Sequence, residues 1–244
     1  MSSVFDNESD VGHHHISKQY DHELLAIRHR VLRLGGLVEA QVESAVIALH
    51  ESDVELAERV IMDDYKVNTL EVAIDEECTK ILALRQPAAR DLRLVVAVIK
   101  TITDLERIGD EAKRIARIAI DLADHYPKKN QLTDLQQLAQ HSRLMLREAL
   151  DAFARMDVDE SLRVVHEDQQ VDREYESIMR QQITYMMEDP RSIPVSLNIM
   201  WSARALERIG DRACNICEYV IYSAMGKNIR HISIDQVERD LKSG

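Results

Sequence analysis

The chain has 244 residues, of which 45% are apolar, and a formal net charge of -12 at pH 7. This length allows one large domain or two small ones, and the apolar content is ample for a buried core. The negative charge argues against a general binder of nucleic acid or anionic membranes, which needs a basic face. Aromatic residues make up 4%, and Gly (7) and Pro (4) are scarce. This composition is typical of helices packed by aliphatic side chains.

Cysteine usage and hydropathy indicate the compartment. Cys78, Cys214 and Cys217 do not form a secreted disulfide framework. No apolar run approaches the ~20 residues that span a bilayer, and the polar N-terminus has no signal-peptide core. We therefore expect a cytoplasmic protein without direct membrane insertion. Residues 1–17, which include a run of three histidines, are expected to be a disordered tail.

The first half of the chain predicts three helices. Apolar residues recur in three- and four-residue steps from Lys18 to His50, which indicates a long amphipathic helix. Adjacent glycines at 35–36 interrupt it and would let another helix approach closely. Ser52 opens a capping-box pattern that starts a second helix. Pro87 ends this helix because proline cannot continue the hydrogen-bond ladder, and a third is expected over about 88–125.

The second half restarts the pattern after a polar join near Pro127. Its predicted helices cover residues 132–155, 160–187 and 195–225, with a cap at Asp157 and chain-breaking prolines at 190 and 194. Each half is therefore helix, turn, helix, proline break, helix. The expected fold is all-α, with two antiparallel three-helix bundles side by side. The expected domains are residues 18–127 and 128–228, followed by a tail, 229–244.

The repeat is clearest in two octets, TDLERIGD at 103–110 and RALERIGD at 204–211. In both, a glutamate precedes an aspartate by four residues, which places the two carboxylates on one helical face, a turn apart. The glycine before each aspartate costs roughly 1 kcal/mol in a helix relative to alanine, so bulk is expected to be unwelcome there. The octets are offset by 101 residues, whereas the helices that precede them align at an offset of 104.

In each half, the second and third helices both carry carboxylates at four-residue spacing. The candidate metal ligands are Glu71, Asp75, Glu106 and Asp110 in the first half, and Asp168, Asp172, Glu176, Glu207 and Asp211 in the second. If neighbouring helices place these pairs side by side, the carboxylates converge on one patch per half. Oxygen-rich clusters of this kind suit Mg²⁺, Ca²⁺, Mn²⁺ or iron.

Other interpretations remain open at this point. The acids would form only salt bridges if arginines such as Arg107, Arg114 and Arg208 paired with them, leaving a purely structural scaffold. The Cys214–Cys217 pair is interpreted as buried core. A carboxylate-bridged di-metal oxidase needs Glu-x-x-His, and no histidine of the predicted helices follows a glutamate by three residues. No motif for a phosphate-cradling loop or a nucleophile is present, so we predict that the protein is not an enzyme.

Several segments together resemble one known family. They are the two ERIGD copies, VNTLEVAIDEEC with RQPAARDLRLV after it, DAFARMD at 151–157 and TYMMEDPRSIP at 184–194. They are similar to the PhoU family of bacterial phosphate-transport accessory proteins, over about residues 14–231.

The resemblance implies a cytoplasmic homodimer of chains with two PhoU-type domains. It also implies metal clusters (Mg, Mn, Fe or Zn) at the paired acidic positions, with Asp168 replacing or supplementing Asp172 as a ligand. It also implies a negative regulator of the phosphate-starvation response. Its expected partners are the ATPase subunit of a phosphate ABC transporter and a phosphate-sensing histidine kinase, with no nucleic acid.

Overall fold

Six long helices make up the structure, a computed structural model that describes residues 8–123, 129–226 and 236. They are α1 (Glu8–Glu51), α2 (Val54–Arg85), α3 (Ala89–Ala123), α4 (Lys129–Arg155), α5 (Val158–Glu188) and α6 (Ile193–Met225), with a short 3₁₀ turn, η1 (Pro190–Ser192), before the last. The described residues contain no strand. The predicted all-α fold is confirmed, because aliphatic residues at three- and four-residue steps give each helix a stripe that packs on its neighbours.

The start of α1 differs from the expectation. The helix begins at Glu8, well before Lys18, so most of the stretch expected to be a disordered tail is helical. Residues 1–7 lie outside the described part of the chain.

Two helix starts are capped by aspartates. Asp157 caps α5 as predicted, since its side chain accepts a hydrogen bond of 3.0 Å from the backbone N–H of Glu160. The cap of α2 is Asp53 rather than Ser52, and it accepts from Leu56 N at 2.9 Å. Ser52 has a φ of 57°, in the left-handed region, where it closes the turn after α1.

The prolines act differently in the two halves. Pro87 follows the end of α2 at Arg85 as predicted, with Gln86 at a φ of 47° between them. Pro194 does not break the chain, because it lies in the first turn of α6, where its missing N–H would have no helical partner. The predicted join near Pro127 and most of the predicted tail lie outside the described residues.

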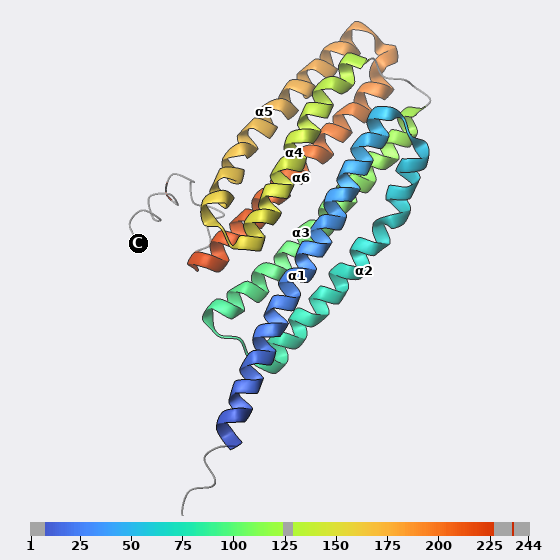
Figure 1. The fold of residues 1–244 in the computed structure, drawn as a ribbon. Helices are drawn as coiled ribbons and strands as arrows, with labels where there is room; N and C mark the ends of the chain where they lie inside the picture. Colours follow the sequence, from blue (N-terminus) through green and yellow to red (C-terminus); the bar gives the residue numbers. More distant parts are fainter. Residues whose placement is uncertain (1–7, 124–128, 227–235, 237–244) are drawn as a thin grey trace, which may run out of the picture.

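The two bundles, α1–α3 and α4–α6, lie side by side (Figure 1). Helix α3 packs on α6 and α1 packs on α4, so one apolar cluster extends through both halves. Gly35 permits the α1–α4 approach, because a Cβ there would lie 2.4 Å from a methyl of Leu150. A Cβ on Gly36 would meet no atom within 4 Å. Helices α2 and α5 flank the assembly, and each lies against the octet-bearing helix of its own half.

The cysteines belong to the core, as predicted. Cys78, Cys214 and Cys217 are free and buried, and burial raises the pKa of the Cys78 thiol to about 12, which makes it an unreactive core residue. Among the helices that the structure describes, none is long and apolar enough to cross a bilayer.

Candidate metal centre

The glycine of each octet faces an aspartate on the neighbouring helix. A Cβ on Gly109 of α3 would lie 3.7 Å from Asp64 Oδ1 of α2, and a Cβ on Gly210 of α6 would lie 3.6 Å from Asp168 Oδ1 of α5. Asp64 and Asp168 are related by the offset of 104 residues, and the glycines by the offset of 101. Equivalent residues therefore meet in the two halves. The predicted intolerance of bulk also holds, since a Cβ would lie 3.0 Å from Gln41 Oε1 at Gly109 and 3.3 Å from a methyl of Val171 at Gly210.

In the first half, α2 and α3 bring their predicted acids near each other. Burial, followed by the charges of Asp110 and Glu71, raises the pKa of Glu106. Burial and the charge of Asp75 likewise raise the pKa of Glu71. Glu71 and Glu106 are half-buried, whereas Asp75 and Asp110 are exposed. The first half thus contains the acidic surface that the four-residue spacing predicted.

The sequence interpretation missed Asp64, the most buried acid of this surface, which is 5% exposed. The Nζ atom of Lys113 lies 2.5 Å from Asp64 Oδ2 and 2.9 Å from Asp110 Oδ1. Burial works to lower the pKa of Lys113, but its hydrogen bonds to the two aspartates raise it overall, so the ammonium stays charged. The signal was available, since Asp64 is the counterpart of the predicted ligand Asp168.

The second half gathers Asp168 and Asp172 of α5 with Glu207 and Asp211 of α6. Burial, followed by the charges of Asp172 and Asp211, raises the pKa of Asp168 to about 6. Burial and the charge of Asp211 raise the pKa of Glu207 to about 7, against the opposing effect of Arg204. Burial and Asp172 also raise the pKa of Asp211. Each shift includes the charge of another member, so the four carboxyl groups act on one another electrostatically.

Glu176 differs from the other predicted ligands on α5. It is exposed, and it accepts a hydrogen bond of 3.3 Å from Arg180, one turn further along the same helix. The charge of Glu176 is not among the causes that raise the pKa of Asp168, Glu207 or Asp211. The structure therefore brings Asp168 into the cluster more closely than Glu176.

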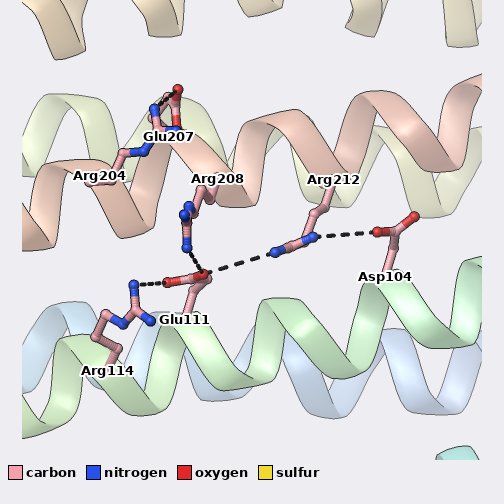
Figure 2. A network of polar contacts seen from close by, with 7 residues as sticks. All are labelled: Asp104, Glu111, Arg114, Arg204, Glu207, Arg208 and Arg212. Atoms are coloured by element: carbon pink, nitrogen blue, oxygen red, sulfur yellow. Dashed lines mark hydrogen bonds and ion pairs between the residues drawn. The ribbon is translucent and has the colours of Figure 1, made fainter. Parts of the chain in front are cut away.

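Most arginines near the octets point to the interface between α3 and α6 (Figure 2). Glu111, a buried acid that sequence reasoning did not single out, lies 3.2 Å from Arg208 and 3.3 Å from Arg114. Arg212 lies 3.6 Å from Asp104. Arg114 and Arg208, which the salt-bridge interpretation assigned to the octet acids, are thus engaged by Glu111 instead.

Arg204 is the exception among the arginines of α6. Its guanidinium lies 2.5 Å from Glu207 Oε1, and the two groups are three residues apart on one helix (Figure 2). The second carboxylate oxygen, Oε2, is buried without a hydrogen-bond partner. Arg204 therefore offsets only part of the negative charge on this cluster.

The second-half cluster fits a hard cation by its donor set. Asp168 Oδ1 and Glu207 Oε2 are both buried without a hydrogen-bond partner in the structure, and carboxylate oxygens are the ligands that Mg²⁺, Mn²⁺ and Ca²⁺ prefer. Among the residues that the structure describes, no group of three His, Cys, Asp or Glu side chains forms a preformed metal-coordination site. Coordination would therefore require carboxylate rotamers to turn toward a shared ion while the helices stay in place.

Comparisons with known proteins agree with this organisation in two halves. The family model of the PhoU domain matches the chain twice, at residues 31–119 and 135–220. The phosphate-specific transport system accessory protein PhoU of Serratia marcescens is 52% identical over 225 residues, covering 92% of either chain. The protein of the same name from Escherichia coli K12 is 50% identical over 227 residues, covering 92% of this chain and 93% of that one.

Two solved structures share the fold. The crystal structure of PhoU from Pseudomonas aeruginosa superposes with a TM-score of 0.83 at 49% identity, covering 85% of this chain and all of that one. The phosphate transport system regulatory protein PhoU from Streptococcus pneumoniae gives a TM-score of 0.80 at 32% identity, covering 86% and 98% of the two chains. With two matching domains and about half of its residues shared along nearly the full length of such relatives, the chain belongs to the PhoU family.

Proposed function

We propose that the protein is an accessory component of a phosphate-specific transport system. The observation that carries this proposal is the 52% identity to the Serratia marcescens accessory protein across 92% of both chains. Identity at this level, with the family model matching both halves of the chain, favours a shared role. An accessory role also suits a site built of carboxylates, to which we assign binding rather than catalysis.

In the finer form of the proposal, the protein is a non-enzymatic adapter in the cytoplasm. It contacts the ATPase subunit of a phosphate ABC transporter and a phosphate-sensing histidine kinase, and it keeps the phosphate-starvation response low when phosphate is plentiful. The long helical surfaces of two bundles offer room for two partners at once. We expect the working form to be a homodimer.

The proposed adapter binds divalent or iron-type metal ions through its acidic clusters. In the second half the ligands would be Asp168, Asp172, Glu207 and Asp211, supported by the two buried carboxylate oxygens that lack protein partners. A bound cation supplies positive charge that neutralises these groups and so changes the electrostatic surface offered to a partner. In the first half, Glu71, Asp75, Glu106 and Asp110 remain the predicted set, next to Asp64.

The regulatory role is tested in a strain that lacks its own copy of the gene. Expression of this chain is expected to restore low activity of a phosphate-starvation reporter in high phosphate. A variant with Asp168→Asn and Asp211→Asn tests whether the acidic cluster contributes. It should fold but restore repression less well than the unaltered chain. A reporter that stays fully active with the unaltered chain contradicts the adapter proposal.

Metal binding is tested separately, on protein purified without chelator. Mass spectrometry is expected to find bound metal, and the double variant Asp110→Ala with Asp211→Ala should carry less. Metal content that is the same in both proteins refutes the ligand assignment. Thermal unfolding that is indifferent to EDTA would instead favour a purely structural scaffold, because a bound ion stabilises the native state by mass action.

A further inference from the structure

Helices α3 and α6 share a surface that is rich in arginine, which we call the arginine face. Its members are Arg107, Arg114 and Arg117 of α3 and Arg204, Arg208 and Arg212 of α6. The side chains of Arg114, Arg204 and Arg208 are 52, 45 and 39% exposed, and Arg107 and Arg117 are exposed as well. Since the whole chain has a net charge of -12, the arginine face is a basic surface on an acidic protein.

The spacing of these residues places them on one side of each helix. On α3, Arg107 and Arg114 lie seven residues apart, with the buried Glu111 between them, and three- and four-residue steps stay on one helical face. On α6, Trp201 and Arg208 also lie seven residues apart. Glu111 of α3 lies 3.2 Å from Arg208 of α6. The two rows are therefore neighbours across the contact between the helices (Figure 2).

The arginine face contains more guanidinium groups than its ion-pair network contains carboxylates. Three arginines share Glu111. They are Arg114, Arg208 and Arg212, at 3.3, 3.2 and 3.9 Å. Arg212 also lies 3.6 Å from Asp104, the second carboxylate of the network, and the exposed Arg107 and Arg117 lie outside it. The network thus supplies two carboxylates for five of the six arginines, so the face keeps a surplus of positive charge.

Acidic clusters border the arginine face along both of its long edges. Glu106 and Asp110 lie on the α2 side, and Glu207 and Asp211 lie on the α5 side. A wide polyanion, such as a DNA duplex or an anionic membrane, would bring negative charge over these clusters and be repelled. An occupant as narrow as a single helix contacts the arginines without crossing either edge.

The residue types on the face favour a protein partner. A guanidinium group forms two parallel hydrogen bonds with a carboxylate. Trp201, the single tryptophan of the chain, is 55% exposed on the same side of α6 as Arg208. Tryptophan and arginine are enriched among the residues that dominate binding between proteins, whereas proteins that hold single-stranded nucleic acid stack successive bases on several aromatic side chains.

We propose that the arginine face docks an acidic amphipathic helix of a partner protein. Carboxylates at three-, four- and seven-residue steps of that helix pair with the arginines of α3 and α6, and an apolar side chain near one end packs on Trp201. This inference rests on the proposed adapter role and specifies the chemistry of one partner. Because α3 belongs to the first half and α6 to the second, the docked helix contacts both halves at once.

The test uses the full-length chain, with the fluorescence of Trp201 as the reporter. The probe is a synthetic helical peptide of about 20 residues, with glutamates at three- and four-residue steps and one leucine near an end. It is expected to bind and to shift the emission of Trp201, whereas the same peptide with lysines in place of glutamates should do neither. Raising the salt concentration from about 0.05 to about 0.5 M should weaken binding by about tenfold, because salt screens exposed charges.

A pair of double variants locates the binding surface. Arg107→Glu with Arg117→Glu reverses two charges of the arginine face outside the Glu111 network and should weaken peptide binding by about tenfold or more. The matched control is Arg59→Glu with Lys80→Glu, which reverses two exposed cations on the side of α2 toward α1. It changes the net charge equally and should leave the affinity within about twofold. Circular dichroism verifies that both variants remain helical.

The outcomes distinguish the docking surface from the adapter role beneath it. Equal affinities of the two double variants, or an unaltered chain that does not bind the acidic peptide, overturn the docking surface. Tighter binding of a single-stranded oligonucleotide or of phosphatidylglycerol vesicles overturns the choice of a protein helix.

The starvation reporter supplies the second readout. A chain with Arg107→Glu and Arg117→Glu should repress it poorly, and the control variant should repress it normally. Full repression by both variants overturns the docking surface and leaves the adapter role intact. Failure of the unaltered chain to repress refutes the adapter role, and the inference with it.

Discussion

Glu207→Gln isolates the electrostatic cost of the second cluster. Glutamine has nearly the shape of glutamate but does not ionise, so the variant removes one charge from the cluster with little change in packing. In the metal-free protein, burial and Asp211 raise the pKa of Glu207 from 4.5 to about 7. At about 1.4 kcal/mol per pKa unit, ionising this buried group in the folded state costs roughly 3 kcal/mol more than in the unfolded chain.

The direction of the pH effect follows from that shift. Because the folded pKa is above the unfolded one, the folded state holds the proton more tightly, and the stability gained this way is complete below the unfolded pKa. It is lost as the pH rises through the folded pKa of about 7. Between a pH below 4.5 and a pH above 7, the unaltered protein in EDTA should therefore lose roughly 3 kcal/mol more stability than Glu207→Gln.

The assay is urea unfolding followed by circular dichroism in EDTA, at a pH below 4.5 and at a pH above 7. Glu176→Gln serves as the control, because that side chain is exposed and paired with Arg180. It should follow the pH dependence of the unaltered protein. If Glu207→Gln also follows that dependence, the charge of Glu207 is not confined with its neighbours, and the reasoning about an uncompensated cluster is wrong.

Three further predictions concern packing, the interface and the ion. Gly35→Ala should destabilise the protein by about 1–3 kcal/mol, because the new methyl overlaps Leu150. Gly36→Ala should instead stabilise it by up to about 1 kcal/mol. Urea unfolding measures both effects, and equal effects would contradict the close approach of α1 and α4. Glu111→Gln should cost roughly 2 kcal/mol, since it removes the charge of the buried carboxylate that the partly exposed guanidinium groups of Arg208 and Arg212 share. A loss below about 1 kcal/mol would show that this network contributes little. Mn²⁺ at 100 times its dissociation constant should raise the unfolding free energy by about 2.7 kcal/mol, and the same addition to Asp211→Asn should have a much smaller effect in a calorimetric scan.

The helices were predictable because they depend on residues close in sequence, and the duplication was predictable because two segments of the sequence nearly repeat each other. Aliphatic residues in three- and four-residue steps, an aspartate cap at Asp157 and a proline after Arg85 each act within one or two turns of helix. The two octets revealed the repeat, and the repeat revealed that the acidic patches come in pairs. The boundary errors at Glu8, Asp53 and Pro194 are local as well, since several neighbouring residues were able to start each helix.

Asp64 was missed for a different reason. On its own helix, Asp64 resembles an ordinary surface acid such as its neighbour Asp63. Its importance comes from Gly109 and Lys113 on another helix, which touch it only after α2 and α3 have packed. Applying the offset of 104 residues to Asp168 would have identified it without any structure.

The sequence by itself determined six helices, two equivalent halves and a set of carboxylates on matching helical faces, because these properties follow from local periodicity and from the repeat. Only the tertiary structure decided which cation meets which acid. Lys113 lies near Asp110 on any helix, but packing alone carries it to Asp64, and packing alone turns Arg208 toward Glu111 and away from its own cluster. Charge pairing between helices depends on distances across an interface, and sequence spacing does not contain those distances.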